Sequence, residues 1–298
     1  MATAKISKGL FEKHGVQVEK PVMFRSWAQL VEAFLSGNVN VVHLLSPMSL
    51  WAKYGANAPV KAVMWNHLAG SALTVRPEIN SIAELSGKTV AIPFWYSIHN
   101  IVLQRLLREN GLKITEKEPK SGEVRLSVMA PSDMVAALAS EAISGFIVAE
   151  PFNALAEAKG VGKVLRFSGD VWKDHACCLT LMHEYDIQHR PEWVQKVVNA
   201  LTEAQVSTLA NRAETAQLLA RAAATRRTIK KCWKRYWLQP KLSGINISKQ
   251  GQFKTLSGTN SESVSNRIRS IPIWKSWSKC SNRPTLPAIM RFYNSLTR

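Results

Sequence analysis

The chain has 298 residues, 46% of them hydrophobic, which is enough for a buried core and about two domains. It has no run of about 18 apolar residues, which excludes an ordinary membrane-spanning helix, and its 4 cysteines lack metal-ligand spacing, so no metal or cofactor is expected. The formal net charge of +18 is uneven, since residues 221–298 contain 17 Lys/Arg and one acid while residues 1–220 contain 22 Lys/Arg and 20 acids.

Ser46, Pro47 and Met48 follow a predicted buried strand over 39–45 and start the next predicted helix. Serine is favoured as a helix cap and proline in the first helical turn, so this triplet predicts a helix start that Ser46 caps and whose free N–H groups point outward. The alternative is an ordinary strand-to-helix turn.

The segment over 87–152 contains two strand–loop–helix units of the same kind. Short apolar runs and helical spacing predict strands and helices in alternation, over 87–93, 98–110, 123–130, 131–143 and 146–149. Such alternation indicates an α/β fold with a parallel sheet, which binds small ligands outside the carboxyl ends of its strands. Helix N-termini at that edge offer unpaired N–H groups and positive dipole ends, which suit an anion.

The loop after the first of these strands holds three consecutive aromatic residues, Phe94, Trp95 and Tyr96. Exposing all three would be unfavourable, so we expect at least one to pack while another faces a ligand. Ser97 either caps the following helix or donates to an anion. His99, in the first helical turn, is a ligand candidate, and the alternative is a surface helix residue.

Two features follow the repeated units. Glu150 ends a strand just before Pro151, where its carboxylate either accepts from a ligand or braces the loop, and bracing is the favoured interpretation. Cys177 and Cys178 lie in an apolar strand, where core packing is favoured over a disulfide or a metal site. There is no nucleophile elbow, Walker A loop or other catalytic constellation, so no catalytic residue is predicted.

The tail over 225–298 differs in kind from the amphipathic helical stretch over 191–220. Helical periodicity stops, acids nearly vanish, and four tryptophans lie among Lys, Arg, Ser and Asn. Three interpretations are open: single-stranded nucleic acid binding, adhesion to an anionic membrane surface, or the product of a shifted reading frame. The shifted frame is favoured, so no nucleic acid partner is expected.

Six stretches carry a family resemblance, namely 8–19 (KGLFEKHGVQVE), 36–48 (SGNVNVVHLLSPM), 85–93 (LSGKTVAIP), 131–138 (PSDMVAAL), 146–152 (FIVAEPF) and 191–201 (PEWVQKVVNAL). Each is weak alone, but the ordered set is specific. The chain resembles the periplasmic substrate-binding proteins of ABC importers, most closely those for nitrate, bicarbonate, sulfonate, taurine and thiamine-precursor pyrimidines. The resemblance implies a periplasmic monomer that captures a small anion or polar solute and meets a transporter permease.

The resemblance also implies a two-lobed periplasmic-binding-protein fold of type II, in which the solute lies in a cleft between lobes joined by crossing strands. The first part of lobe one, lobe two, the helices that return to lobe one and the irregular tail are expected at 1–78, 79–184, 185–224 and 225–298. Ligand roles are implied for Trp27, which opens a predicted helix over 28–35, for the triplet Ser46–Met48 and for His175. The alternatives are a core tryptophan and a loop histidine.

Both ends depart from the family pattern. The family has a strand and a signal peptide ahead of the helix that begins at Lys8, and neither is visible here. Nothing after Ala224 resembles the family's C-terminal helices, so a binding protein with altered ends is expected. An enzymatic relative, the thiamine-pyrimidine synthase, uses several cysteines near its ligand, and Cys177-Cys178 are too few to favour that alternative.

Overall fold

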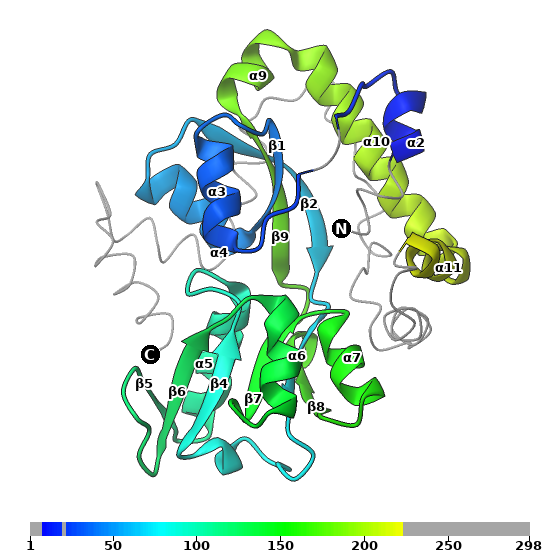
Figure 1. The fold of residues 1–298 in the computed structure, drawn as a ribbon. Helices are drawn as coiled ribbons and strands as arrows, with labels where there is room; N and C mark the ends of the chain where they lie inside the picture. The colour runs from blue at the N-terminus through cyan, green and yellow to red at the C-terminus, as the bar shows by residue number, and fades with distance from the viewer. Residues whose placement is uncertain (1–7, 20–21, 223–298) are drawn as a thin grey trace. The chain divides into compact units, whose positions relative to one another are not determined.

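The computed structural model describes residues 8–19 and 22–222 (Figure 1). The basic tail over 225–298 lies outside these residues, so its three interpretations stay predictions. Within the described part of the chain, no helix combines the length and the apolar character needed to cross a membrane.

The described chain divides into two compact units. The central unit is His67–Cys177 with the described residues from 207 onward, and the terminal unit is the described residues up to Asn66 with Cys178–Val206. The unit boundaries fall inside two strands, β2 (Val60–Leu68) and β9 (Ala176–His183), so these strands run from one unit into the other. The lobe boundaries predicted after residues 78 and 184 stay a prediction.

A six-stranded mixed sheet forms the centre of the central unit. Its strands, in spatial order, are β5 (Lys113–Thr115), β6 (Glu123–Val128), β4 (Lys88–Ile92), β7 (Gly145–Ala149), β3 (Ser71–Val75) and β8 (Lys163–Phe167). The first four are parallel, and β3 runs antiparallel to both β7 and β8. The predicted α/β class is confirmed, with one antiparallel strand inserted beside the parallel group.

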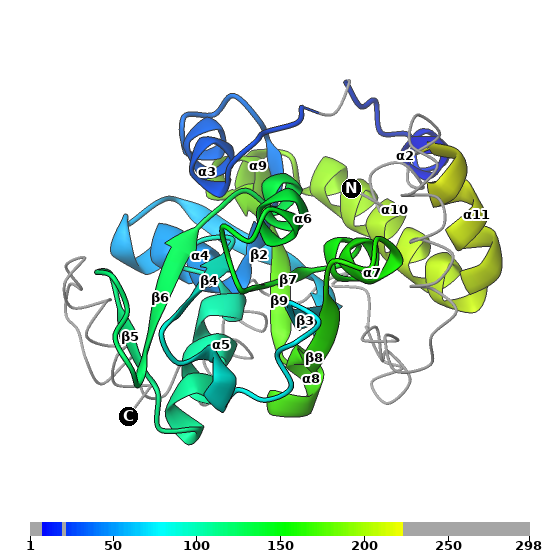
Figure 2. The ribbon, with the colours of Figure 1, turned by 60° about the horizontal axis from the view of Figure 1, so that its bottom comes forward.

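Helices cover both faces of this sheet. α6 (Pro131–Ala139) and α7 (Phe152–Ala158) pack on one face, where Met134, Leu138 and Ala156 share a buried cluster with Phe146. Figures 1 and 2 show α5 (Ile98–Glu109) on the opposite face. Shorter helices lie at η2 (Ala83–Leu85) and α8 (Ser168–Val171). The apolar spacing within 98–110 explains the position of α5, since its apolar side chains are buried against the sheet.

The terminal unit contains the three-stranded sheet β1–β9–β2, in which β1 (Val41–Leu45) runs antiparallel to β9. Its helices are α2 (Lys8–Lys13), α3 (Trp27–Leu35), α4 (Ser46–Leu50), the π-helix η1 (Trp51–Gly55), α9 (Glu184–His189) and most of α10 (Pro191–Ala210). The last residues of α10, from Ser207, and the following α11 (Arg212–Ala222) belong to the central unit. One buried cluster joins the two ends of this unit in the sequence, with Val16 and Met64 against Val197 and Leu201. The helical stretch predicted over 191–220 is confirmed as α10 and α11.

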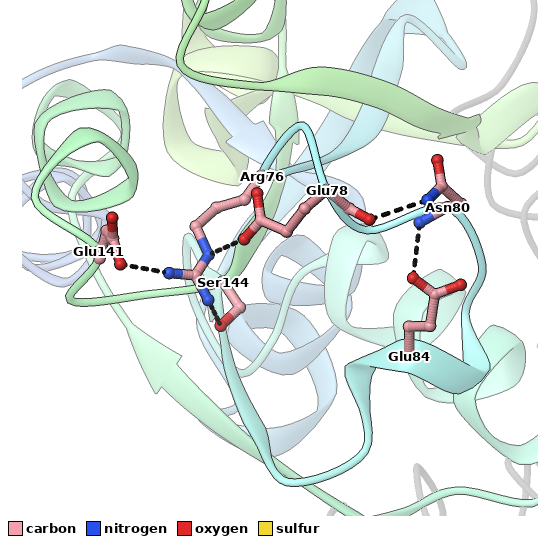
Figure 3. Close-up of polar contacts among 6 residues, drawn as sticks. All are labelled: Arg76, Glu78, Asn80, Glu84, Glu141 and Ser144. Carbon is pink, nitrogen blue, oxygen red and sulfur yellow. Dashed lines mark hydrogen bonds and ion pairs between the residues drawn. The ribbon is translucent and has the colours of Figure 1, made fainter.

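A polar network fixes the loop that follows β3 in the central unit (Figure 3). The Arg76 guanidinium lies 2.9 Å from Glu78, 2.9 Å from Glu141 and 3.5 Å from the Ser144 hydroxyl. The Asn80 side chain donates to the Glu78 carbonyl at 2.8 Å, and its backbone N–H donates to Glu84 at 2.9 Å. Arg76 is only 19% exposed, so water screens its ion pairs less than it screens a fully exposed pair.

Candidate functional site

The carboxyl ends of β4, β6 and β7 meet at one edge of the central sheet, and the loops that follow them lead into α5, α6 and α7. The strand register brings two more segments to this edge. Ser71, at the start of β3, lies opposite Ala149 at the end of β7, and Ala72 lies opposite Phe167 at the end of β8. Residues from five places in the chain therefore gather at the edge where parallel sheets bind ligands.

The aromatic loop after β4 is tied to the first turn of α5. Ser97 is fully buried, accepts a hydrogen bond from the Asn100 N–H at 3.1 Å and donates to the Phe94 carbonyl at 2.7 Å. The Asn100 side chain donates to the Trp95 carbonyl at 2.9 Å. Ser97 is therefore the helix cap, as one of its two predicted roles required, and its ligand contact stays a prediction.

The rings of this loop are half-buried. Phe94 and Tyr96 have ring centroids 6.0 Å apart, and burial raises the pKa of the Tyr96 hydroxyl. Trp95 is also half-buried, so part of its ring stays accessible. None of the three rings is fully exposed, and the expectation that one of them faces a ligand stays a prediction.

His99 is 2% exposed, so the alternative that it is a surface residue is wrong. The physical reason is that α5 turns its first residues onto the sheet, where the His99 Nε2 lies 2.8 Å from the Ser71 hydroxyl. That hydroxyl is also 4.0 Å from the sulfur of Cys177. The second ring nitrogen of His99, Nδ1, is buried without a hydrogen-bond partner among the described residues.

His175 lies in the same unit, between α8 and β9, and is 3% exposed. Its Nδ1 is 2.6 Å from the Trp172 carbonyl, and within the described ranges no partner reaches its buried Nε2. The pKa of His175 is below its ordinary value, chiefly because burial disfavours the charged ring. The hydrogen bond to the Trp172 carbonyl and the charge of Cys177 raise the pKa, whereas the charges of His99 and His67 lower it.

His67 and Cys177 form a second polar pair in the central unit. Burial acts to lower the pKa of His67, but the charge of Cys177 and a hydrogen bond with it raise the pKa above its usual value. Cys177 and Cys178 are both buried in β9, as core packing requires, and no disulfide joins them to each other. No motif marks Ser71 or His67 in the sequence; each is a polar residue beside apolar strand residues.

Glu150 follows β7 at the same edge. Its carboxylate accepts from the Ala154 N–H at 3.1 Å, in the first turn of α7, which is the bracing contact that the sequence favours. Burial raises the pKa of Glu150 to about 7, although the Ala154 N–H and the Asn153 side chain favour its charged form. Near neutral pH the residue is therefore close to half ionised.

The other four predicted contacts lie in the terminal unit. Trp27 is half-buried and begins α3, whose cap is Ser26, with its hydroxyl 3.2 Å from the Gln29 N–H. Ser46, Pro47 and Met48 are buried and begin α4, with Pro47 in the first turn as predicted.

The prediction that Ser46 caps α4 is wrong. The helix starts one residue earlier than expected, so Leu45 occupies the cap position and provides no side-chain cap. Met48 is 1% exposed and is among the largest fully buried side chains, so it belongs to the core. The predicted ligand contacts of Trp27 and Ser46–Met48 stay predictions.

Residues 2–224 match the model of the NMT1-like family. The chain is 23% identical over 219 residues to the nitrate/nitrite binding protein NrtA of Nostoc sp.. This alignment covers 66% of this chain and 48% of that protein. The chain is 28% identical over 194 residues to the taurine-binding periplasmic protein of Escherichia coli, covering 63% of this chain and 57% of that protein. This chain thus spans about half the length of the curated relatives that it matches.

A solved structure shows the same fold. The alkanesulfonate-binding protein SsuA of Xanthomonas axonopodis pv. citri, bound to MOPS, aligns with a TM-score of 0.67 at 18% identity, covering 82% of this chain and 81% of that one. The predicted fold of the periplasmic substrate-binding proteins is thereby confirmed. Since the family model matches far more than half of the sequence, the chain belongs to the NMT1-like family.

Proposed function

We propose that the chain is the solute-binding component of an ABC importer and captures a small anion or polar organic solute such as nitrate, a sulfonate or taurine. Family membership supports this, as do the relatives, which are a nitrate/nitrite binding protein, a taurine-binding protein and an alkanesulfonate-binding protein. We further propose a periplasmic location, a transporter permease as partner, a monomeric state and no catalytic activity.

The observation that carries the proposal is a pair of buried histidines with unsatisfied ring nitrogens in the central unit. His99 Nδ1 and His175 Nε2 are both buried without partners among the residues described. A buried polar group without a hydrogen bond destabilises a protein by about 1–3 kcal/mol, so such groups are rare unless a ligand, ion or water completes them. Both belong to segments that lead to or from the edge where parallel sheets bind small molecules.

The rest of this edge suits a small polar solute. The half-buried Trp95 and Tyr96 offer apolar ring faces, and the N-terminus of α5 offers positive dipole character within one turn of His99. Glu150 braces the neighbouring loop at α7. The direct solute contacts that we propose in this unit are therefore Trp95, Tyr96, His99 and His175.

The test is a thermal-shift panel on the full chain, first shown to be folded by circular dichroism. Nitrate, bicarbonate, taurine, alkanesulfonates and aminopyrimidines form the panel. A solute at a hundred times its Kd adds about 2.7 kcal/mol of stability, which raises Tm by roughly 5–10 °C for a chain of this size. If a folded chain shows no shift with any solute, the proposal is rejected.

A further inference from the structure

The proton on His175 has a fixed position. A carbonyl oxygen only accepts hydrogen bonds, and the Trp172 carbonyl lies 2.6 Å from Nδ1 of His175. The hydrogen of this bond must therefore come from the ring, so Nδ1 is protonated. In a neutral imidazole only one nitrogen carries a hydrogen, which leaves Nε2 with a lone pair.

The surroundings keep this ring neutral. His175 is 3% exposed, and burial disfavours the charged imidazolium. His99 from α5 and His67 from β2 add positive charge nearby when protonated, while Cys177 from β9 acts in the opposite direction. The net effect lowers the pKa of His175 below its ordinary value, so the ring is neutral near neutral pH.

Nε2 of His175 is therefore a buried acceptor, and no donor reaches it within residues 8–19 and 22–222. A fully deprotonated anion such as nitrate offers only acceptors, and two acceptors facing each other repel. A solute with an ammonium, amide or hydroxyl hydrogen would satisfy the atom directly.

We infer that His175 accepts a hydrogen bond from the solute through Nε2, so that the site selects solutes that carry a donor hydrogen over anions that only accept. This inference rests on the proposed function and narrows its solute class. His99 does not impose the same selection, because its Nε2 contacts the Ser71 hydroxyl, which can either donate or accept.

A corollary concerns anions without a donor. For such an anion to contact Nε2, His175 must first take up a proton, so its binding consumes one proton from solution. The affinity for nitrate should then fall about tenfold for each unit of pH above the pKa of His175. A donor-bearing solute needs no proton and should bind with nearly constant affinity over the same range.

The position of the proton can be tested without any ligand. In ¹⁵N NMR of the labelled full chain, a ring nitrogen with a hydrogen and one with a lone pair give well-separated signals. The His175 signals are those missing from His175→Leu or, if that variant does not fold, those left after variants at the other histidines. We expect hydrogen on Nδ1 alone near neutral pH, and hydrogen on Nε2 overturns the inference.

The selection is tested with three sulfonates of similar size whose far ends differ. These are 2-aminoethanesulfonate, 2-hydroxyethanesulfonate and propane-1-sulfonate, which end in an ammonium, a hydroxyl and a methyl group. The first two should bind the wild-type chain about tenfold or more tightly than the third. His175→Leu should remove that preference.

The matched control is His189→Leu, which should keep the preference for donor-bearing sulfonates. His189 makes the same kind of contact, with Nδ1 2.9 Å from the Tyr185 carbonyl, but it is exposed on α9. Equal affinity of the wild-type chain for all three sulfonates overturns the inference.

If the chain binds nitrate as well as sulfonates, calorimetry in two buffers of different ionisation enthalpy shows whether a proton is taken up with the nitrate. Uptake of one proton per nitrate supports the inference, and no uptake overturns it. Binding of nitrate without any donor-bearing solute also overturns it. If no solute of the whole panel binds, the proposed function fails, and the NMR result still decides the position of the proton.

Discussion

Ser71 and His99 lie 28 positions apart in the sequence, yet the Ser71 hydroxyl and the His99 Nε2 are buried 2.8 Å from each other. The contact joins the first residue of β3 to the first turn of α5. It fixes the orientation of an imidazole whose other nitrogen has no partner among the described residues. Ser71 is therefore a positioning residue for one of the proposed solute contacts.

Ser71→Ala should destabilise the chain by about 1–3 kcal/mol, because it leaves the His99 Nε2 buried without a partner. Urea unfolding followed by circular dichroism measures this loss. The matched control is Ser132→Ala, since the Ser132 hydroxyl is exposed and, among the described residues, donates only to the adjacent Asp133 carboxylate. The control should lie within about 0.5 kcal/mol of the wild type. Equal stability of the two variants would show that the Ser71 contact contributes nothing.

The raised pKa of Glu150 predicts that the free energy of unfolding falls as pH rises through the mildly acidic range. Its pKa in the folded chain is about 7, against an ordinary value of 4.5, so the folded state holds a proton that the unfolded state has released. The stabilisation is complete below the unfolded pKa and is lost as pH rises from about 4.5 to about 7. After allowance for the partial exposure of the carboxyl, we expect a loss of about 1–2 kcal/mol.

Glu150→Gln should remove this part of the pH dependence, because an amide does not titrate and can still accept from the Ala154 N–H. Free energies of unfolding of the wild-type chain and the variant, measured at several pH values between 4 and 8, test this prediction. Glu116→Gln, at an exposed position, should leave the wild-type slope in place. The assignment to Glu150 is wrong if its variant keeps the full slope.

The contacts of Arg76 predict that two arginine variants differ in their free energy of unfolding. Arg76→Ala removes a 19% exposed guanidinium that contacts Glu78, Glu141 and Ser144, and should lower stability by about 1–2 kcal/mol. Arg105→Ala removes an exposed ion pair with Glu109, at 2.8 Å on the same helix, and should change the free energy of unfolding by about 0.5 kcal/mol or less. Chemical denaturation of both variants decides, and a larger loss at Arg105 would contradict the role of the network.

The sequence predicts correctly those helices whose position and start depend on residues close together in the chain. The apolar spacing of 98–110 and the capping serine Ser97 both act within one helical turn, so α5 and its start could be predicted. The cap of α4 failed for a similarly local reason. Leu45 and Ser46 stand side by side at the strand end, and periodicity does not decide which of them begins the helix.

Contacts between distant strands could not be predicted in this way. Asn153 is fully buried, accepts from the Thr74 hydroxyl at 2.8 Å and donates to the Val148 carbonyl at 2.9 Å. Asn153 and Thr74 are 79 positions apart in the sequence and come into contact only because β3 pairs with β7. No pattern of residues in the sequence predicts that pairing. The burial of His99 against Ser71 was missed for the same reason.

The most direct test of the proposed function is the Kd of the best panel solute, measured by isothermal titration calorimetry on the wild-type chain and two histidine variants. His99→Gln replaces a buried proposed contact, and His189→Gln replaces an exposed histidine of the terminal unit. We predict a single site per chain, about tenfold or more weaker in His99→Gln and unchanged in His189→Gln. A folded wild-type chain that binds no solute, or binding that the two variants leave equally intact, would contradict the account.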